Sequence, residues 1–186
     1  MESKTVYLGM IGDIMHPGLI NIINEATKYG DVMIGLYTDK AIATHKRLPY
    51  LTYEQRKQVI ESIKGVSTIV PQDDWSYVPN LVKYKPDYLI HGDDWLYGPD
   101  KYIRDECFKV MEGLGGKVIE IPYTKGISAS GLKEAIDSLG VTPQARLASL
   151  RRLISAKPIV RIMESHCGLT GLIIEHTKVE VGNEIR

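Results

Sequence analysis

The chain has 186 residues, of which 44% are apolar, so it can bury the core of one ordinary domain with residues left over. Lysine plus arginine and aspartate plus glutamate are equal at 23 each, so no overall field attracts nucleic acid or an anionic membrane, and neither is expected as a partner. The two cysteines, Cys107 and Cys167, are far apart in sequence, and residues 1–4 begin no hydrophobic secretory segment. We therefore expect a cytoplasmic protein.

The first forty residues show a strand, a helix and a second strand. Residues 6–11 form a short apolar run that predicts a strand, and residues 32–37 predict another. Between them a helix is expected, ended by Gly30, because apolar side chains recur at the helical spacing at Leu19, Ile22, Ile23 and Ala26.

Strands and helices continue to alternate up to residue 121. Thr52 and Gln55 form a capping-box signal at the start of a helix that contains Val59, Ile60 and Ile63. Short strands are predicted at 66–70, 88–90 and 117–121, separated by crossover helices around 78–84 and 102–114. This alternation predicts an α/β fold with a Rossmann-like, doubly wound parallel sheet.

The character of the sequence changes near residue 141. Thr142 and Pro143 predict the start of a helix, and basic residues gather on it and after it, at Arg146, Arg151, Arg152, Lys157 and Arg161. Strand-like runs follow at 159–163 and 172–174. We therefore divide the chain into a domain over residues 1–140 and a basic helical extension over residues 141–186, which resembles the start of a second domain.

Doubly wound sheets bind ligands beyond the carboxyl ends of their strands, and in this chain those ends are polar. The stretch GDIMHPG after the first strand contains Asp13, His16 and Gly18. Backbone amides at the head of the following helix can hold phosphate oxygens, while His16 can donate a hydrogen bond to a transferred phosphoryl group. The alternative is a turn histidine beside a Pro-Gly helix start.

Three further stretches carry polar side chains that could bind a ligand. HKRLPYLTYEQRK gathers cations that either bind phosphate or form a solvated basic face: His45, Lys46, Arg47, Arg56 and Lys57. HGDDW places two carboxylates and an indole directly after a strand, as a ligand-binding turn or an exposed one. TKGISASGLKEAI places Ser128 and Ser130 at a helix start, where an N-cap explains only one serine.

From about Thr5 to Ile136 these stretches resemble, in order and approximate spacing, the cytidylyltransferase-like nucleotidyltransferases, which include glycerol-3-phosphate cytidylyltransferase. That family carries an aspartate followed by H-x-G-H, an arginine on the second helix, G-D-D-W in some members and an I-S-T-T segment. The counterparts in this chain are Asp13, His16 and Gly18, then Arg56, then Gly92, Asp93, Asp94 and Trp95, then Ile127, Ser128 and Ser130.

A closer resemblance covers nearly the whole chain. YLTYEQRK, HGDDW, IPYTKGIS and RRLISAKPIVRIMESHCGLTGLIIE look like the N-terminal cytidylyltransferase part of bifunctional phosphonate-biosynthesis proteins, in which a phosphoenolpyruvate mutase barrel follows. The resemblance implies transfer of CMP from CTP to a phosphonate such as 2-hydroxyethylphosphonate, with Mg²⁺ as cofactor and pyrophosphate as product. It also implies that residues 141–186 are a basic linker helix and the truncated start of a mutase domain. A homodimer is one possible assembly.

The resemblance also assigns roles to individual residues. His16 would stabilise the transition state, Lys46 and Arg56 would hold phosphate or phosphonate oxygens, and Ser128 and Ser130 would hold the triphosphate. The other counterparts of the family motifs would shape the nucleotide pocket: Asp13, Gly18, Gly92, Asp93, Asp94, Trp95 and Ile127.

Two positions depart from the family pattern. Leu19 stands where H-x-G-H has its second histidine, and Tyr123 stands where the family has an arginine before I-S-T-T. Leu19 cannot donate a hydrogen bond, and losing one preorganised donor typically costs roughly 10²–10³ in rate. Two alternatives therefore stay open: a nucleotide-binding or structural domain that has lost catalysis, and a protein whose activity resides in the mutase barrel.

Overall fold

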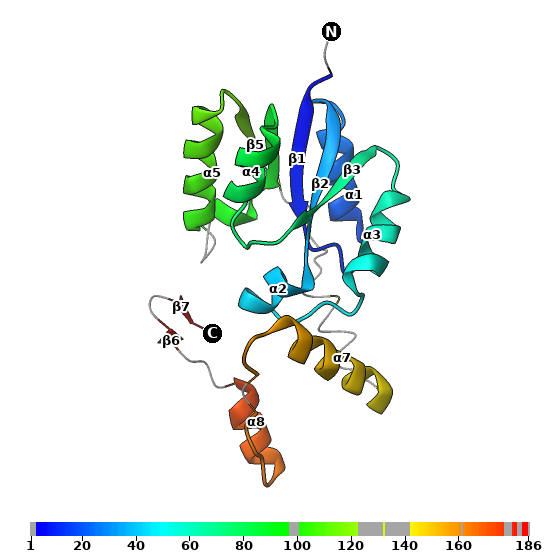
Figure 1. The fold of residues 1–186 in the computed structure, drawn as a ribbon, viewed down its shortest axis with the longest axis vertical. Helices are drawn as coiled ribbons and strands as arrows, with labels where there is room; N and C mark the ends of the chain where they lie inside the picture. The colour runs from blue at the N-terminus through cyan, green and yellow to red at the C-terminus, as the bar shows by residue number, and fades with distance from the viewer. Residues whose placement is uncertain are drawn as a thin grey trace.

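The computed structural model describes residues 3–96, 101–122, 132, 142–160, 162–176, 180–181 and 184–185. Five parallel strands form one sheet in the order β3-β2-β1-β4-β5, which confirms the predicted doubly wound α/β fold (Figure 1). The strands are β1 (Thr5–Met10), β2 (Asp31–Tyr37), β3 (Val66–Gln72), β4 (Tyr88–Gly92) and β5 (Lys117–Ile121). The order of the strands reverses between β1 and β4, where such sheets bind their ligands.

Helices cover both faces of the sheet. On one face lie α1 (Pro17–Ala26) and α3 (Tyr53–Glu61), and on the other lie α4 (Val78–Tyr84) and α5 (Lys101–Gly113). Strand β1 divides its side chains between the two cores, since successive residues of a strand point to opposite faces. Val6, Leu8 and Met10 pack with α1 and α3, whereas Tyr7 packs with α4 and α5.

The ends of several helices follow from local sequence. The capping box of Thr52 and Gln55 is present at the start of α3, as predicted. Helix α1 begins at Pro17, a favourable first helical position. One helix that was not predicted, α2 (Asp39–His45), begins after Thr38, whose side chain accepts a hydrogen bond from the Ala41 amide.

The extension contains α7 (Pro143–Ala156) and α8 (Gly168–His176), followed by two short paired strands, β6 (Glu180–Val181) and β7 (Glu184–Ile185). The predicted start of α7 is confirmed. The predicted strand at 172–174 is wrong, because these residues lie within α8, and residues 159, 160, 162 and 163 lie in neither a helix nor a strand. A short apolar run does not by itself distinguish a strand from a helix segment.

In the part of the chain that the structure describes, no helix has the length and apolar character needed to cross a membrane.

Candidate functional site

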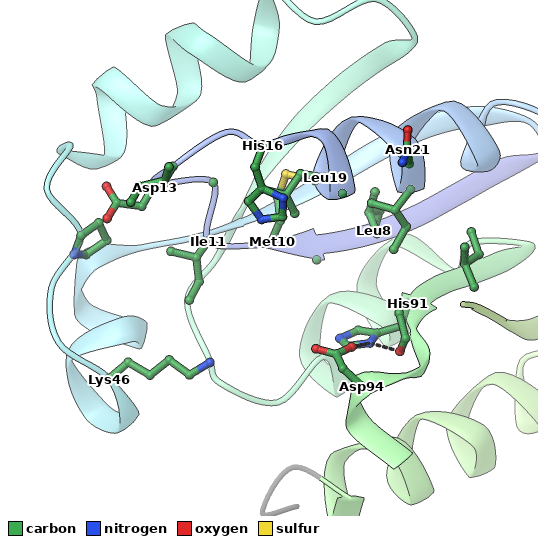
Figure 2. Close-up of a pocket in the computed structure, with 18 of the residues that line it drawn as sticks. Leu8, Met10, Ile11, Asp13, His16, Leu19, Asn21, Lys46, His91 and Asp94 are labelled. Carbon is green, nitrogen blue, oxygen red and sulfur yellow. Dashed lines mark hydrogen bonds and ion pairs between the residues drawn. The ribbon is translucent and has the colours of Figure 1, made fainter. Parts of the chain in front are cut away.

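A pocket of about 500 Å³ opens at the carboxyl ends of β1 and β4 (Figure 2). It is lined by residues that follow β1, by the first turns of α1, by the segment after α2 and by residues at the ends of β4 and β5. Its place is the reversal of strand order, as expected for a doubly wound sheet, and its volume suits a small-molecule ligand.

The turn that leaves β1 depends on Gly12. Its φ of +66° lies in the left-handed region, which favours glycine, and a Cβ there would come within 2.5 Å of Ile60 Cδ1. The next residue, Asp13, lines the pocket. Its carboxylate accepts hydrogen bonds from the backbone amides of Tyr50 at 2.9 Å and Leu51 at 3.0 Å. Asp13 therefore positions the segment that joins α2 to α3.

His16 is the N-cap residue of α1, but its side chain makes no capping hydrogen bond. The residue is only 9% exposed, and its buried Nδ1 has no hydrogen-bond partner among the described residues. Burial lowers the pKa of His16 below its ordinary value, so the neutral imidazole is favoured near neutral pH. Figure 2 shows the ring directed into the pocket. The His16 ring thus lines the pocket and has one buried nitrogen without a partner, which makes the residue suited to contact a ligand.

The wall beside His16 is largely apolar. Leu19, at the position that departs from H-x-G-H, lines the pocket and is half-buried. Other apolar side chains of this wall come from β1 and α1, among them Leu8, Met10 and Ile22. Leu19 lies outside the two buried core clusters, so a polar group at this position would face the pocket.

The segment that joins α2 to α3, residues 46–52, is called the cation loop below. Lys46 and Arg47 are exposed residues that line the pocket, and the Lys46 ammonium also lies 5.1 Å from the Trp75 ring centroid. Figure 2 shows the Lys46 side chain extending toward the space between His16 and Asp94. The loop thus provides two cations to the pocket.

The structure places Arg56 behind the pocket and leaves it no exposed surface. Its guanidinium donates to the Ile11 carbonyl at 2.5 Å and to Asp39 Oδ1 at 2.9 Å. Burial also lowers the pKa of Arg56 below its usual range. The expectation that Arg56 holds phosphate oxygens directly is therefore corrected, because its side chain is fully enclosed and both terminal nitrogens donate to protein acceptors, while the buried Nε has no partner among the described residues.

The HGDDW stretch is divided between the pocket and the core. His91, Gly92 and Asp94 line the pocket, whereas Asp93 is not among the lining residues. Trp95 is buried and stacks on the His91 ring at a centroid distance of 3.8 Å. An exposed turn is thus excluded for Trp95.

The position of Trp95 is held by a polar contact at its edge. The indole Nε1 donates to Glu120 Oε1 at 2.6 Å, and Arg104 donates to both oxygens of the same carboxylate. The contact with Arg104, followed by the contact with Trp95, lowers the pKa of Glu120. Glu120 therefore fixes the stack that forms one side of the pocket.

A smaller side pocket of about 180 Å³ adjoins the main pocket, and both are lined by Lys46, His91 and Asp94. Four aromatic side chains form part of its wall: Tyr37, Trp75, Tyr77 and Trp95.

Ile127, Ser128, Ser130 and Tyr123 lie outside the described residues. The residues that the sequence interpretation did not assign to the site include Asn21 and His91, which line the pocket, and Asp39 and Arg152, which support the cation loop. Only His91 had a local signal, since it directly precedes GDDW.

The described residues do not form a metal site of their own. No group of three or more histidine, cysteine, aspartate or glutamate side chains gathers there in a way that could hold a metal ion. Asp13, which is near His16, already accepts two backbone amides. Magnesium therefore does not fit a site built from the described side chains alone.

Comparison with known proteins identifies the family. The protein-family model described as Cytidylyltransferase-like matches residues 12–135. Glycerol-3-phosphate cytidylyltransferase from Bacillus subtilis (strain 168) is 29% identical over 129 residues, which cover 68% of this chain and 92% of that protein. The protein of the same name from Staphylococcus aureus (strain NCTC 8325 / PS 47) is 31% identical over 126 residues, covering 67% and 88%.

A solved structure shows the same fold. The lipopolysaccharide core biosynthesis protein from Thermoplasma volcanium GSS1 matches with a TM-score of 0.56 at 20% identity, over 68% of this chain and 100% of that one. The family model extends over well over half of the chain and includes both the GDIMHPG and the HGDDW stretches. The chain therefore belongs to the cytidylyltransferase-like family of nucleotidyltransferases.

Proposed function

We propose that the protein transfers CMP from CTP to a small phosphonate and releases pyrophosphate. The observation that carries the proposal is His16, whose buried Nδ1 has no partner among the described residues and whose ring is directed into a pocket lined by Lys46 and Arg47. An imidazole with an unpaired nitrogen, in a pocket that also contains cations, is suited to phosphate oxygens.

In the proposed reaction a phosphonate oxygen attacks the α-phosphorus of CTP. A bond forms between that oxygen and the α-phosphorus. The bond from the α-phosphorus to the oxygen that bridges it to the β-phosphorus breaks, and pyrophosphate leaves with the bonding electron pair. The protein aligns the two reactants and neutralises their charge. His16 donates a hydrogen bond to oxygen at the reacting phosphorus, while Lys46 and Arg47 hold phosphate or phosphonate oxygens.

The side pocket supports a small acceptor with a short carbon chain. The polar edges of its aromatic walls make hydrogen bonds within the protein: the Tyr37 hydroxyl donates to the Trp75 carbonyl at 3.0 Å, and the Trp95 indole donates to Glu120. The aromatic rings that line the side pocket offer carbon surface to an acceptor, and Lys46 can reach its charged end. The choice of a phosphonate over a phosphate ester rests on the sequence resemblance to phosphonate-biosynthesis proteins.

We expect Mg²⁺ to enter with the nucleotide, held by triphosphate oxygens, because the described residues offer no cluster of ligands for it. Its chemistry there would be charge neutralisation.

The test is pyrophosphate release by the full chain with CTP, Mg²⁺ and a panel of acceptors. The panel contains 2-hydroxyethylphosphonate, 2-aminoethylphosphonate, glycerol 3-phosphate and ethanolamine phosphate, and ATP replaces CTP as the nucleotide control. We expect release with CTP and a phosphonate. Release with a phosphate ester but with neither phosphonate would overturn the acceptor assignment while leaving cytidylyl transfer intact.

A second candidate is a nucleotide-binding domain without catalysis, and Leu19 is the observation that favours it. Calorimetry with CTP and Mg²⁺ separates the two candidates. Heat of binding without pyrophosphate release from any acceptor would support the second, whereas no heat at millimolar CTP from a folded sample would contradict both.

A further inference from the structure

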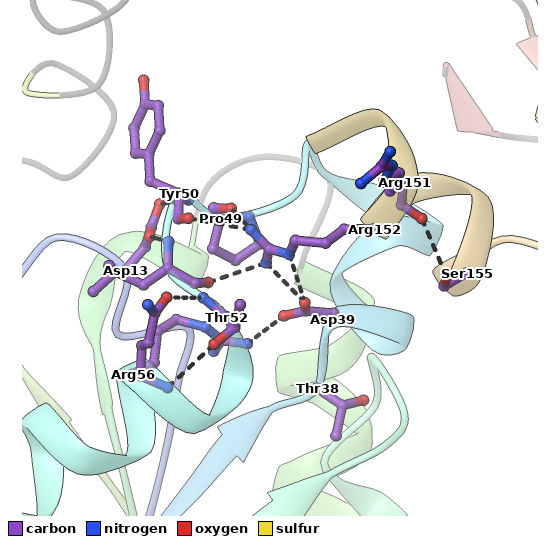
Figure 3. Close-up of polar contacts among 12 residues, drawn as sticks. Asp13, Thr38, Asp39, Pro49, Tyr50, Thr52, Arg56, Arg151, Arg152 and Ser155 are labelled. Carbon is purple, nitrogen blue, oxygen red and sulfur yellow. Dashed lines mark hydrogen bonds and ion pairs between the residues drawn. The ribbon is translucent and has the colours of Figure 1, made fainter. Parts of the chain in front are cut away.

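Arg152, on helix α7 of the extension, reaches back to the sheet domain (Figure 3). Its Nε and Nη2 donate to Asp39 Oδ2 at 3.2 and 2.7 Å. The same guanidinium donates to three backbone carbonyls, those of Pro49 at 2.8 Å, Tyr50 at 3.1 Å and Leu51 at 3.1 Å. These contacts occupy all five N–H donors that an arginine possesses.

The three carbonyls belong to the cation loop, and the opposite side of the same segment is held by Asp13. The Asp13 carboxylate accepts the amides of Tyr50 and Leu51, while Arg152 donates to carbonyls of residues 49–51. Backbone amides and carbonyls of one short segment are thus fixed from two sides, by Asp13 and by Arg152. These contacts are called the clamp below.

Asp39 joins this clamp to the sheet. Its Oδ2 accepts from Arg152, and its Oδ1 accepts from the buried Arg56, which in turn donates to the carbonyl of Ile11 directly after β1. The side chains of Asp39 and Arg152 are only 23% and 18% exposed. A partly enclosed network of charged groups with several backbone partners is far more specific in geometry than a surface ion pair.

We propose that Arg152 is a positioning residue for the site, and that it acts through the cation loop. Fixing residues 49–51 fixes the direction in which Lys46 and Arg47 enter the pocket, so a helix outside the sheet domain determines where two phosphate-binding cations lie. This inference rests on the proposed function, because it assigns Lys46 and Arg47 to phosphate or phosphonate oxygens.

The test compares Arg152→Ala and Arg152→Lys with the matched control Arg151→Ala, in the full chain. Arg151 is the exposed neighbour of Arg152 on α7, and its carbonyl, which the substitution preserves, accepts a hydrogen bond from Ser155. The first measurement is hydrogen exchange of the cation loop, followed by mass spectrometry. We expect exchange there to be about tenfold faster in Arg152→Ala, with β1 and β4 unchanged.

The second measurement is steady-state kinetics with CTP and the accepted phosphonate. Because the cations contact phosphate oxygens in the ground state as well as the transition state, we expect KM to rise by about tenfold and kcat to change less. Arg152→Lys keeps the charge beside Asp39 but lacks the planar fork, so it should recover part of the protection and part of the affinity.

The outcomes separate the two proposals. A wild-type chain that neither binds CTP nor releases pyrophosphate contradicts the proposed function, while faster exchange in the loop would still support the clamp. Unchanged exchange and unchanged KM in Arg152→Ala would overturn the positioning role. So would loss of protection throughout the sheet, since Arg152 would then support the whole fold.

Discussion

The forces that stabilise the sheet domain differ from those that attach helix α7 of the extension to it. Among the described residues, every buried apolar side chain lies between Val6 and Met111. In α7 and α8 most of the large apolar side chains are exposed, for example Leu150 at 43% and Ile154 at 58%, and none of those described is buried. Helix α7 instead contacts the sheet domain through the Arg152 guanidinium. Burial thus builds the domain, whereas directed polar contacts attach α7 near the pocket.

The largest expected effect is on stability, and it contrasts a leucine from each region. Leu89 in β4 is fully buried, so Leu89→Ala should lower the free energy of unfolding by about 2–5 kcal/mol through lost burial and a residual cavity. The matched change Leu150→Ala in α7 should stay within about 0.5 kcal/mol, because the side chain is already exposed. Urea unfolding of both variants measures the difference. Equal losses would show that α7 is packed as tightly as the sheet.

Removing His16 should have the next largest effect, on catalysis alone. His16→Ala deletes a donor at the reacting phosphorus, so we expect pyrophosphate release to fall by roughly 10²–10³. The residue makes no capping hydrogen bond, and the melting temperature should therefore change little. Asn21→Ala, at another position lining the pocket, serves as the comparison variant. A full rate in His16→Ala would remove His16 from the mechanism.

Leu19→His should act in the opposite direction. The new side chain would face the pocket from the first turn of α1 and restore a second donor, raising CMP transfer by roughly 10²-fold, or about 2.7 kcal/mol of transition-state stabilisation. Rate and melting temperature are measured together, because Leu19 is half-buried. A folded variant with an unchanged rate on the whole acceptor panel would show that Leu19 is not what limits the site.

The smallest expected effect concerns pH. Burial lowers the His16 pKa in the free protein, and bound phosphate should raise it, so nucleotide binding should take up protons on the acidic side of neutrality. CTP affinity of the wild type should therefore rise, relative to His16→Gln, as the pH falls from about 7.5 to about 6. Calorimetry in two buffers of different ionisation enthalpy measures the uptake. Equal uptake by the two proteins would assign the protons to CTP itself.

The lowered pKa of His16 also makes the stability of the folded protein depend on pH. Because the folded state favours neutral His16, the unfolded chain binds the proton more readily. The contribution of His16 to stability is therefore complete above about pH 6.5 and decreases as the pH falls below that value.

Local sequence signals predicted much of the fold. Helix α4 and strand β5 have the expected bounds, and the capping box at Thr52 begins α3 as predicted, because these signals depend on neighbouring residues. Helix α2 was missed, since its seven residues are too few for a clear apolar period. The run at 172–174 was assigned to a strand because its composition suits both states.

The site was predictable where its residues lie near the end of a strand. Gly92 ends β4 and Asp94 soon follows it, while Asp13 and His16 lie between β1 and α1, and the topology of a parallel sheet brings such residues together. The burial of Arg56 and the contact between Arg152 and Asp39 depend on partners far away in sequence. The Arg152–Asp39 contact spans 113 positions, and no periodicity or motif records it.

The two carboxylate oxygens of Asp39 bind different arginines, and this matters for any attempt to divide the protein into fragments. Composition suggests a cut near residue 140, yet a fragment ending there would lose the partner of one carboxylate oxygen and of three loop carbonyls. Such a fragment could keep its sheet and still present a different pocket from that of the whole chain. Substrate screens on the isolated sheet domain would then report the preferences of an altered site, so the natural unit for such screens includes α7.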